Sequence, residues 1–147
     1  MKMAKLMLLL SILSTPGWAA PRIEVFKSPT CGCCEAWVHH LQENGFDVSV
    51  QETQNLQPVK ERAHIPPGKG SCHTSFIEGY VVEGHVPASD IKRLLEERPE
   101  AQGLTVPRMP IGSPGMEMGK RRDAYKVLLF QQDGSTEVFS EYPEIRE

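Results

Sequence analysis

The apolar residues of this chain recur with two spacings, one typical of helices and one typical of strands. Residues 34–41 place apolar side chains at i, i+3, i+4 and i+7, which predicts a helix that ends at Asn44-Gly45. Residues 46–51 alternate between apolar and polar side chains, which predicts a strand with one buried face. The same reasoning predicts strands at 23–26, 74–82, 125–130 and 136–139, helices at 55–63 and 89–98, and an irregular segment rich in Pro, Gly and Met at 103–119.

Turn signals join these elements into one domain. Gly79 interrupts the β-rich segment at 74–82, and Asp133-Gly134 lies between the last two strands, which is a strong hairpin signal. The sequence contains no internal repeat and no linker that would divide it. The order β-α-β-α-β-α-β-β therefore predicts a single α/β domain.

The first nineteen residues have the pattern of a secretory signal peptide. Lys2 and Lys5 precede a short apolar run from Leu6 to Leu13. The small residues Gly17 and Ala19 stand at the two positions that the peptidase inspects. This run is shorter than the roughly 20 residues that a membrane-spanning helix needs. We therefore expect cleavage after Ala19, a mature domain at 20–147 without a membrane span, and a location outside the cytoplasm.

Length and charge narrow the function classes. The chain has 147 residues, of which 39% are hydrophobic, and this is enough for one hydrophobic core. The formal net charge of −3 becomes −5 once the two lysines of the signal peptide are removed. A nucleic acid as the main partner is not expected, because phosphate binding needs a basic protein surface.

Four cysteines carry the strongest chemical signal. Cys31, Cys33 and Cys34 lie between a predicted strand and a predicted helix, and Cys72 precedes the third strand. At a helix N-terminus, unpaired backbone N–H groups stabilise a thiolate, which can attack a disulfide or bind a soft metal ion. Cys31 and Cys34 have the C-x-x-C spacing of a redox pair. Three sulfurs within four residues also form a compact group of metal donors, to which Cys72 could add a fourth.

Two ordinary disulfides, Cys31–Cys34 and Cys33–Cys72, are the alternative to a metal or redox site. An even number of cysteines in a secreted chain favours this interpretation. However, a mature chain of 128 residues has less need of disulfides than a very small domain, and closely spaced cysteines close loops too short to give much stabilisation. Composition and spacing leave both interpretations open.

The donor atoms indicate which metals such a site would bind. Thiolates and thioethers favour Cu(I), zinc or iron–sulfur clusters over hard cations. The irregular segment adds Met109, and Met116 with Met118, whose thioethers are suitable cuprous ligands in an oxidising compartment. Zinc remains the alternative, because four sulfurs match a closed structural site. Iron–sulfur ligation lacks its usual wider cysteine spacing.

The histidines carry a weaker signal. His85 is the best candidate ligand, since it lies in a turn before a predicted helix, although a surface histidine is the more common case. If 72–76 is extended, His73 and Cys72 point to opposite faces and do not share one metal ion. His39 and His40 fall at predicted solvent-facing positions, and His64 falls at the end of a predicted helix.

Three segments together resemble one known family. Pro-Thr-Cys-Gly-Cys-Cys at 29–34, Gly-Tyr-Val-Val-Glu-Gly-His-Val-Pro at 79–87 and Val-Pro-Arg-Met-Pro-Ile-Gly-Ser-Pro-Gly-Met-Glu at 106–117 are similar to the periplasmic copper-resistance CopG family. The resemblance extends over about residues 22–140 and implies a thioredoxin-like domain, with a central mixed sheet flanked by helices and a C-terminal hairpin. Pro107 would be the cis-proline that faces the cysteines of such a fold.

The resemblance also implies a function. Cu(I) would be bound as a thiolate-bridged multinuclear cluster, and the protein would serve copper tolerance beside other periplasmic copper-handling proteins. The metal ligands carried over from the family would be Cys31, Cys33, Cys34 and Cys72, with Met109, Met116 and His85 as further candidates.

The leading hypothesis is therefore a periplasmic Cu(I)-binding protein. Interconversion of Cu(I) and Cu(II) would follow if Cys31 and Cys34 cycle between thiolate ligands and a disulfide. The alternatives are a thioredoxin-like thiol–disulfide oxidoreductase that acts on periplasmic proteins, and a structural domain with two disulfides. Whether the protein is an enzyme is open at this stage.

Overall fold

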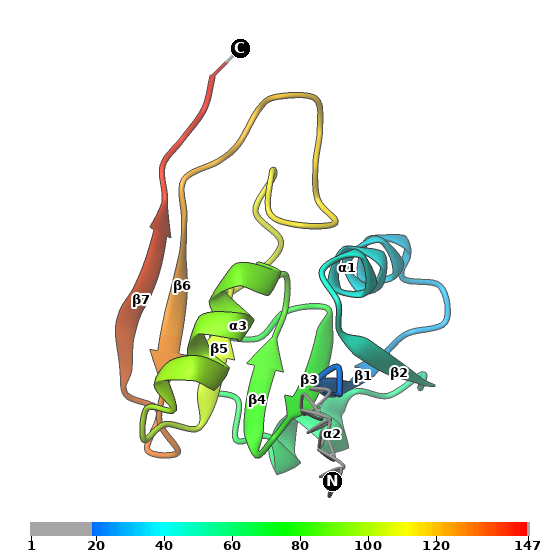
Figure 1. The fold of residues 1–147 in the computed structure, drawn as a ribbon, viewed down its shortest axis with the longest axis vertical. Helices are drawn as coiled ribbons and strands as arrows, with labels where there is room; N and C mark the ends of the chain where they lie inside the picture. Colours follow the sequence, from blue (N-terminus) through cyan, green and yellow to red (C-terminus); the bar gives the residue numbers. More distant parts are fainter. Residues whose placement is uncertain (1–18, 147) are drawn as a thin grey trace, which may run out of the picture.

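A computed structural model describes residues 19–146 and shows a seven-stranded sheet with three helices (Figure 1). The predicted signal peptide lies outside the described residues except for Ala19. None of the helices in 19–146 is long and apolar enough to cross a membrane. In chain order the elements are β1 (Arg22–Lys27), α1 (Gly32–Glu43), β2 (Asp47–Glu52), α2 (Gln57–Arg62), β3 (His73–Ile77), β4 (Tyr80–Glu83), α3 (Ala88–Glu97), β5 (Gly103–Thr105), β6 (Tyr125–Phe130) and β7 (Thr136–Tyr142).

The sheet is mixed and has the strand order β2-β1-β3-β4-β5-β6-β7. β1 pairs with β2, and β4 with β5, in parallel, whereas the other neighbours are antiparallel. β6 and β7 form the hairpin that Asp133-Gly134 predicted. The predicted single α/β domain with a central mixed sheet and a C-terminal hairpin is confirmed, and the thioredoxin-like assignment stays a prediction.

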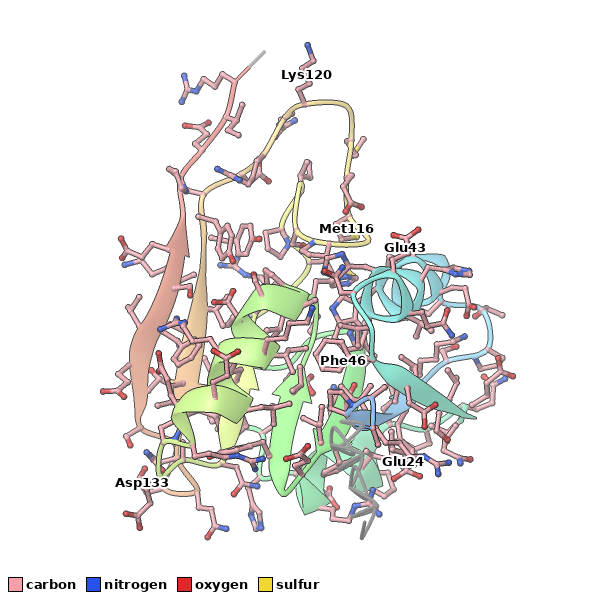
Figure 2. All side chains as sticks on the ribbon, in the orientation of Figure 1. Glu24, Glu43, Phe46, Met116, Lys120 and Asp133 are labelled. Carbon is pink, nitrogen blue, oxygen red and sulfur yellow. A yellow bond between two sulfur atoms is a disulfide. The ribbon has the colours of Figure 1, made fainter. Side chains whose placement is uncertain are left out.

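Helices cover both faces of the sheet. α1 and α3 share one face, where the fully buried Trp37, Leu41 and Ile91 pack with residues from β1 to β6 in the main core. A smaller core on the opposite face contains Ala63, which directly follows α2. Neighbouring residues of one strand belong to different cores, because successive side chains of a strand point to opposite faces of the sheet. Figure 2 shows Phe46, after α1, directed into the main core.

Two segments differ from the sequence prediction in detail. The β-rich segment at 74–82 is a hairpin, since Glu78 and Gly79 have φ of 46° and 90° and form the tight turn between β3 and β4. The segment predicted to be irregular from 103 contains β5, which lies between β4 and β6. A Cβ at Gly103 would lie 1.9 Å from the Val81 carbonyl oxygen, so only glycine fits there. Three fully buried residues show no alternation, which is why the pattern did not indicate this strand.

The irregular segment predicted at 103–119 begins after β5 and continues further along the chain, and we call residues 106–124 the irregular segment. The segment leaves the end of β5 and extends beyond the sheet before it returns to β6, with Lys120 at its tip (Figures 1 and 2). It also packs closely on α1, since a Cβ at Gly115 would lie 2.7 Å from the Cys33 carbonyl oxygen. Every peptide bond between residues 19 and 146 is trans, so the expected cis peptide at Pro107 is wrong.

Candidate metal centre

Strand register brings the four cysteines to one end of the sheet. β1 ends at Lys27 and leads through a short turn to Cys31, which caps the N-terminus of α1. β3 begins antiparallel beside β1, with His73 opposite Lys27, so Cys72 arrives next to the turn that follows β1. Two segments separated by 38 residues, from Cys34 to Cys72, therefore meet at the same place.

The cysteine sulfurs form one compact group. Cys31 and Cys34 are joined in a disulfide, and Cys33 and Cys72 are free thiols. The Cys33 Sγ lies 3.5 Å from the Cys31 Sγ and 3.9 Å from the Cys72 Sγ. One disulfide of the two-disulfide alternative is thus formed and the second is not. All four sulfur atoms lie within 4.8 Å of one another, and we call Cys31, Cys33, Cys34 and Cys72 the four-sulfur group.

Two buried histidines also lie next to Cys72. Nε2 of His85 lies 3.1 Å and Nδ1 of His73 lies 3.3 Å from the Cys72 Sγ. Neither imidazole is exposed, so the expectation of a surface position for His85 is wrong. The expectation that His73 and Cys72 point apart is also wrong, because Cys72 lies in a bend before β3 and the alternation of a strand does not apply to it.

The sequence contained a signal for this approach of His85. Ile77 pairs with Tyr80 across the turn at Glu78-Gly79. Continuing this register by five residues on each strand places His85 opposite Cys72. His73 had no comparable signal, since its side-chain direction depends on the local bend at residue 72.

Burial keeps both imidazoles neutral. Desolvation lowers the pKa of His73 well below its usual value, and the nearby His85 lowers it further. Desolvation also lowers the pKa of His85, against an opposing hydrogen bond with the Pro114 carbonyl. Because a neutral imidazole keeps one nitrogen lone pair, each histidine can serve as a metal ligand without first losing a proton.

Cys72, unlike the two histidines, must lose a proton when it binds a metal ion. Burial, and then the neighbouring Cys33, raise the pKa of the Cys72 thiol to about 12. Cys72 is therefore protonated at neutral pH in the metal-free protein. A metal ion that binds its sulfur must displace this proton, so metal binding at Cys72 releases acid.

A buried carboxylate holds the loop before Cys72. Glu83 at the end of β4 accepts hydrogen bonds from the Ser71 backbone N–H at 2.7 Å and the Thr74 hydroxyl at 2.6 Å, and it is paired with Lys60. Burial raises the pKa of Glu83, and the Lys60 ammonium opposes this effect. The Ser71 hydroxyl donates to the Arg108 carbonyl, which ties this loop to the irregular segment.

The three methionines of the predicted mature chain differ in their surroundings. Met109 is half exposed, and its sulfur lies 4.0 Å from the Cys33 Sγ, so it can reach the four-sulfur group from the solvent side. Met116 lies on the same segment, and its carbonyl oxygen accepts a hydrogen bond from Gly112 N–H at 2.8 Å. Met118 is mostly exposed.

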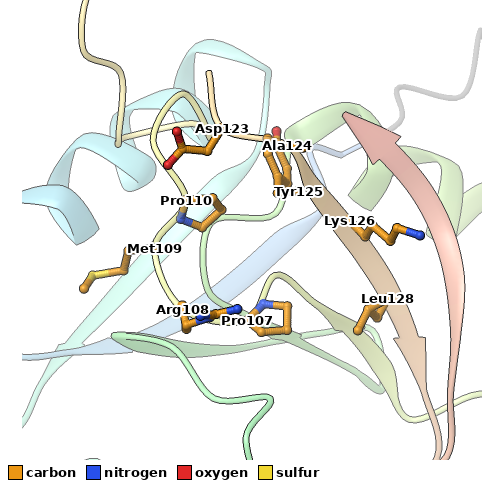
Figure 3. A pocket seen from close by; sticks show the side chains of 9 residues that line it. All are labelled: Pro107, Arg108, Met109, Pro110, Asp123, Ala124, Tyr125, Lys126 and Leu128. Atoms are coloured by element: carbon orange, nitrogen blue, oxygen red, sulfur yellow. The ribbon is translucent and has the colours of Figure 1, made fainter. Parts of the chain in front are cut away.

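A pocket of ≈ 500 Å³ lies between the irregular segment and β6, lined by residues 107–110, 123–126 and Leu128 (Figure 3). In Figure 3 the Met109 side chain points away from Lys126 and Leu128. The pocket therefore adjoins the segment that carries Met109, and the cysteines do not line it.

The other three histidines lie outside the two groups of candidate metal ligands. His39 is exposed, as the sequence predicted, and His64 is exposed just after the C-cap of α2, near the helix end where the sequence placed it. His40 is partly buried, and its Nε2 accepts a hydrogen bond from the Ala88 N–H at 3.0 Å, so the expectation that it is solvated is wrong. Its imidazole joins the end of α1 to the start of α3.

Comparison with known proteins identifies related chains. A family model described as a protein of unknown function, DUF411, matches residues 69–116. A solved structure titled "Copper resistance protein copG- Form 1" is 48% identical, with a TM-score of 0.80, and the match covers 84% of this chain and 98% of that one. A second, "Form 2", is 47% identical with a TM-score of 0.80 over 84% of this chain and 99% of that one. No match was found among curated proteins.

Proposed function

The chain belongs to the family of the copper resistance protein CopG, and on this basis we propose that it binds copper ions at the four-sulfur group as part of copper resistance. One observation carries the proposal: four sulfur atoms from two distant segments lie within 4.8 Å of one another. Since thiolates are soft ligands, this donor set suits copper better than it suits hard cations.

The oxidation state that the site favours is Cu(I). Thiolate and thioether donors stabilise the cuprous ion, and Met109 can supply a thioether beside Cys33. Several ions can be bound together, because each thiolate has lone pairs enough to bridge two of them. The proposed ligands are the four cysteines, with Met109, Met116 and His85 as further candidates. Zinc is the alternative ion for the same sulfur set.

The Cys31–Cys34 disulfide supports a redox role for the same group. Two Cu(II) ions accept one electron each from the Cys31 and Cys34 thiols, two protons leave, and the two sulfurs join in a disulfide. The products are two Cu(I) ions and the oxidised pair. A dithiol reductant must then reopen the disulfide before the next cycle. Because the disulfide withdraws two ligands, its formation loosens the copper that the four-sulfur group held.

The predicted signal peptide at 1–19 supports a periplasmic location for this function. Copper delivery and removal would then involve other periplasmic copper-handling proteins. Export of the chain is tested by fractionation of cells that produce it from its own N-terminus. A protein retained in the cytoplasm with residues 1–19 intact would contradict this part of the proposal.

Anaerobic titration of the fully reduced protein with Cu(I) tests the main proposal. We expect saturable binding that decreases when Cys33 or Cys72 is replaced by serine, and that decreases further when Cys31 and Cys34 are replaced as well. His39→Gln is the matched control, since this imidazole is exposed on α1 and touches none of the sulfurs. Absence of binding, or binding that the Cys→Ser variants leave unchanged, would falsify the proposal.

A thiol–disulfide oxidoreductase is the second candidate. The observation in its favour is the disulfide between Cys31 and Cys34 at the N-terminus of α1, where the helix favours a thiolate at Cys31 or Cys34 after reduction. This function predicts reduction of insulin by the reduced, copper-free protein. If that protein shows no exchange and Cu(I) binds, the copper function stands alone.

A further inference from the structure

We propose that Cys72, His73 and His85 form a second metal site, the mixed site, which holds one copper ion while the Cys31–Cys34 disulfide is closed. The mixed site shares Cys72 with the four-sulfur group, and it rests on the proposed function only for the choice of copper as its ion. It adds His73 to the possible ligands and gives the oxidised protein a donor set of its own.

The distances suit a single ion. The Cys72 Sγ lies 3.1 Å from His85 Nε2 and 3.3 Å from His73 Nδ1, and the three donor atoms all lie within 4.8 Å of one another. An ion with bonds of about 2.0 Å to nitrogen and about 2.3 Å to sulfur holds its ligand atoms about 3.5 Å apart. Small movements of these side chains are therefore enough to seat it. Two imidazoles and one thiolate are a donor set that copper uses in electron-transfer proteins.

A hydrogen bond orients His85 for this role. Its Nδ1 lies 2.9 Å from the Pro114 carbonyl oxygen, which can only accept, so Nδ1 carries the hydrogen. In the neutral ring the lone pair is then on Nε2, the atom that faces Cys72. Metal-binding histidines commonly have this arrangement, in which a carbonyl on the far nitrogen selects the tautomer and fixes the ring.

His73 is difficult to explain as an ordinary core residue. The ring is fully buried against Trp37, with the ring centroids 4.3 Å apart, and meets His85 edge-on. Among residues 19–146, Nε2 of His73 has no hydrogen-bond partner, and the polar neighbour of Nδ1 is the Cys72 sulfur. Buried polar atoms normally have partners, so this imidazole is an unusual core residue. Ligation of an ion through Nδ1 gives the ring a function and leaves the hydrogen of the neutral imidazole on Nε2.

The disulfide leaves the mixed site intact. Closing Cys31 to Cys34 removes two members of the four-sulfur group, whereas Cys72 keeps a free thiol beside both imidazoles. Formation of the disulfide therefore need not empty the protein of copper. One ion can remain at Cys72 until reduction restores the sulfurs beside it.

The test uses a variant without the four-sulfur group. Cys33→Ser with the Cys31–Cys34 disulfide closed retains one free thiol, Cys72, which a thiol count under denaturing conditions verifies. We titrate it with Co²⁺, whose absorption spectrum reports thiolate ligation, and then add Cu²⁺. The expected result is one equivalent of Co²⁺ with a sulfur-to-cobalt charge-transfer band, displaced by one equivalent of Cu²⁺.

Three substitutions in this background identify the ligands. Since even an outer-shell partner of a metal ligand costs about 10–100-fold in affinity, we expect His85→Gln and His73→Gln to weaken Co²⁺ binding by at least about 10-fold. Cys72→Ser should remove the charge-transfer band, and it keeps the result decisive if a buried histidine variant fails to fold. His39→Gln is the control and should bind as the parent does.

The outcomes separate this proposal from the previous one. Absence of saturable Co²⁺ binding in the Cys33→Ser protein overturns the mixed site, and so does binding that a folded His85→Gln variant leaves unchanged. Neither result affects Cu(I) binding by the reduced wild-type protein, which tests the four-sulfur group. Conversely, loss of Cu(I) binding there leaves the Co²⁺ result standing.

Discussion

The close contact between Gly115 and α1 makes a strong prediction about how the irregular segment is held. Gly115 has φ of +86°, and a Cβ added to it would lie 2.7 Å from the Cys33 carbonyl oxygen and 2.8 Å from the Trp37 nitrogen. Alanine at this position is therefore disfavoured twice, by its backbone conformation and by backbone atoms of α1 that cannot move aside as a flexible side chain could. We expect Gly115→Ala to push residues 106–124 away from the helix.

Gly45→Ala separates these two effects. Gly45 has φ of +88°, nearly the same conformation, but an added Cβ there meets nothing within 4 Å. The left-handed conformation costs an L residue about 1–2 kcal/mol in either variant. Overpacking adds about 1–3 kcal/mol, and only for Gly115→Ala. The free energy of unfolding should therefore fall by about 1–3 kcal/mol more in Gly115→Ala than in Gly45→Ala.

Urea unfolding of the two variants, with the Cys31–Cys34 disulfide closed in both, measures this difference. With a slope of about 1–3 kcal/mol per molar urea, the midpoint of Gly115→Ala should lie about 1 M below that of Gly45→Ala. Metal affinity at the mixed site should fall as well, because Pro114 carries the carbonyl that orients His85. Equal midpoints for the two variants would refute the close packing of this segment on α1.

Three further predictions concern the core and its hydrogen bonds. Trp37→Phe removes the indole N–H that donates to the buried Val86 carbonyl at 2.8 Å, so the free energy of unfolding in urea should fall by about 1–3 kcal/mol; an unchanged value contradicts this. Gly103→Ala places a Cβ against the backbone of β4 and should destabilise the protein by about 4 kcal/mol or more, measured as soluble yield and urea midpoint; a wild-type midpoint would show that β5 can shift. Desolvation lowers the pKa of His40, so the unfolded chain binds the proton more readily, and the stability that neutral His40 contributes is lost as pH falls below about 6.5. The His40→Gln variant keeps an acceptor for the Ala88 N–H and does not titrate. The free energy of unfolding of wild type relative to this variant should fall from pH 8 to pH 5, and a constant difference would contradict this.

The secondary structure was largely predictable because most elements are amphipathic. The helical spacing at 34–41 corresponds to α1, whose apolar face is buried, and the turn signal at Asp133-Gly134 corresponds to the hairpin of β6 and β7. β5 was not predictable in this way, because its three residues are buried on every side and their role depends on a glycine that lets β4 approach. A three-residue strand exists only where neighbouring strands complete it.

The candidate site was predictable in its chemistry and only partly in its geometry. Three sulfurs within the four residues 31–34 are close together in any fold, so a soft donor group could be inferred directly from C-x-C-C. The approach of Met109 to Cys33 could be proposed from composition, but its distance could not. His40 was misjudged because its partner, the Ala88 N–H, comes from α3.

The sequence by itself predicted the soft donor atoms, a signal peptide, and the order of the elements apart from β5 and the division of residues 74–82 into two strands, since each depends on residues that are neighbours in the chain. Only the tertiary structure decided that Cys72 joins the other cysteines, that His85 and His73 are buried beside it, and that the irregular segment orients one of these rings. The reason is physical. Burial and the bend at residue 72 are set by contacts between distant residues, whereas the local sequence indicated only the turn at Glu78-Gly79 that aligns β3 with β4.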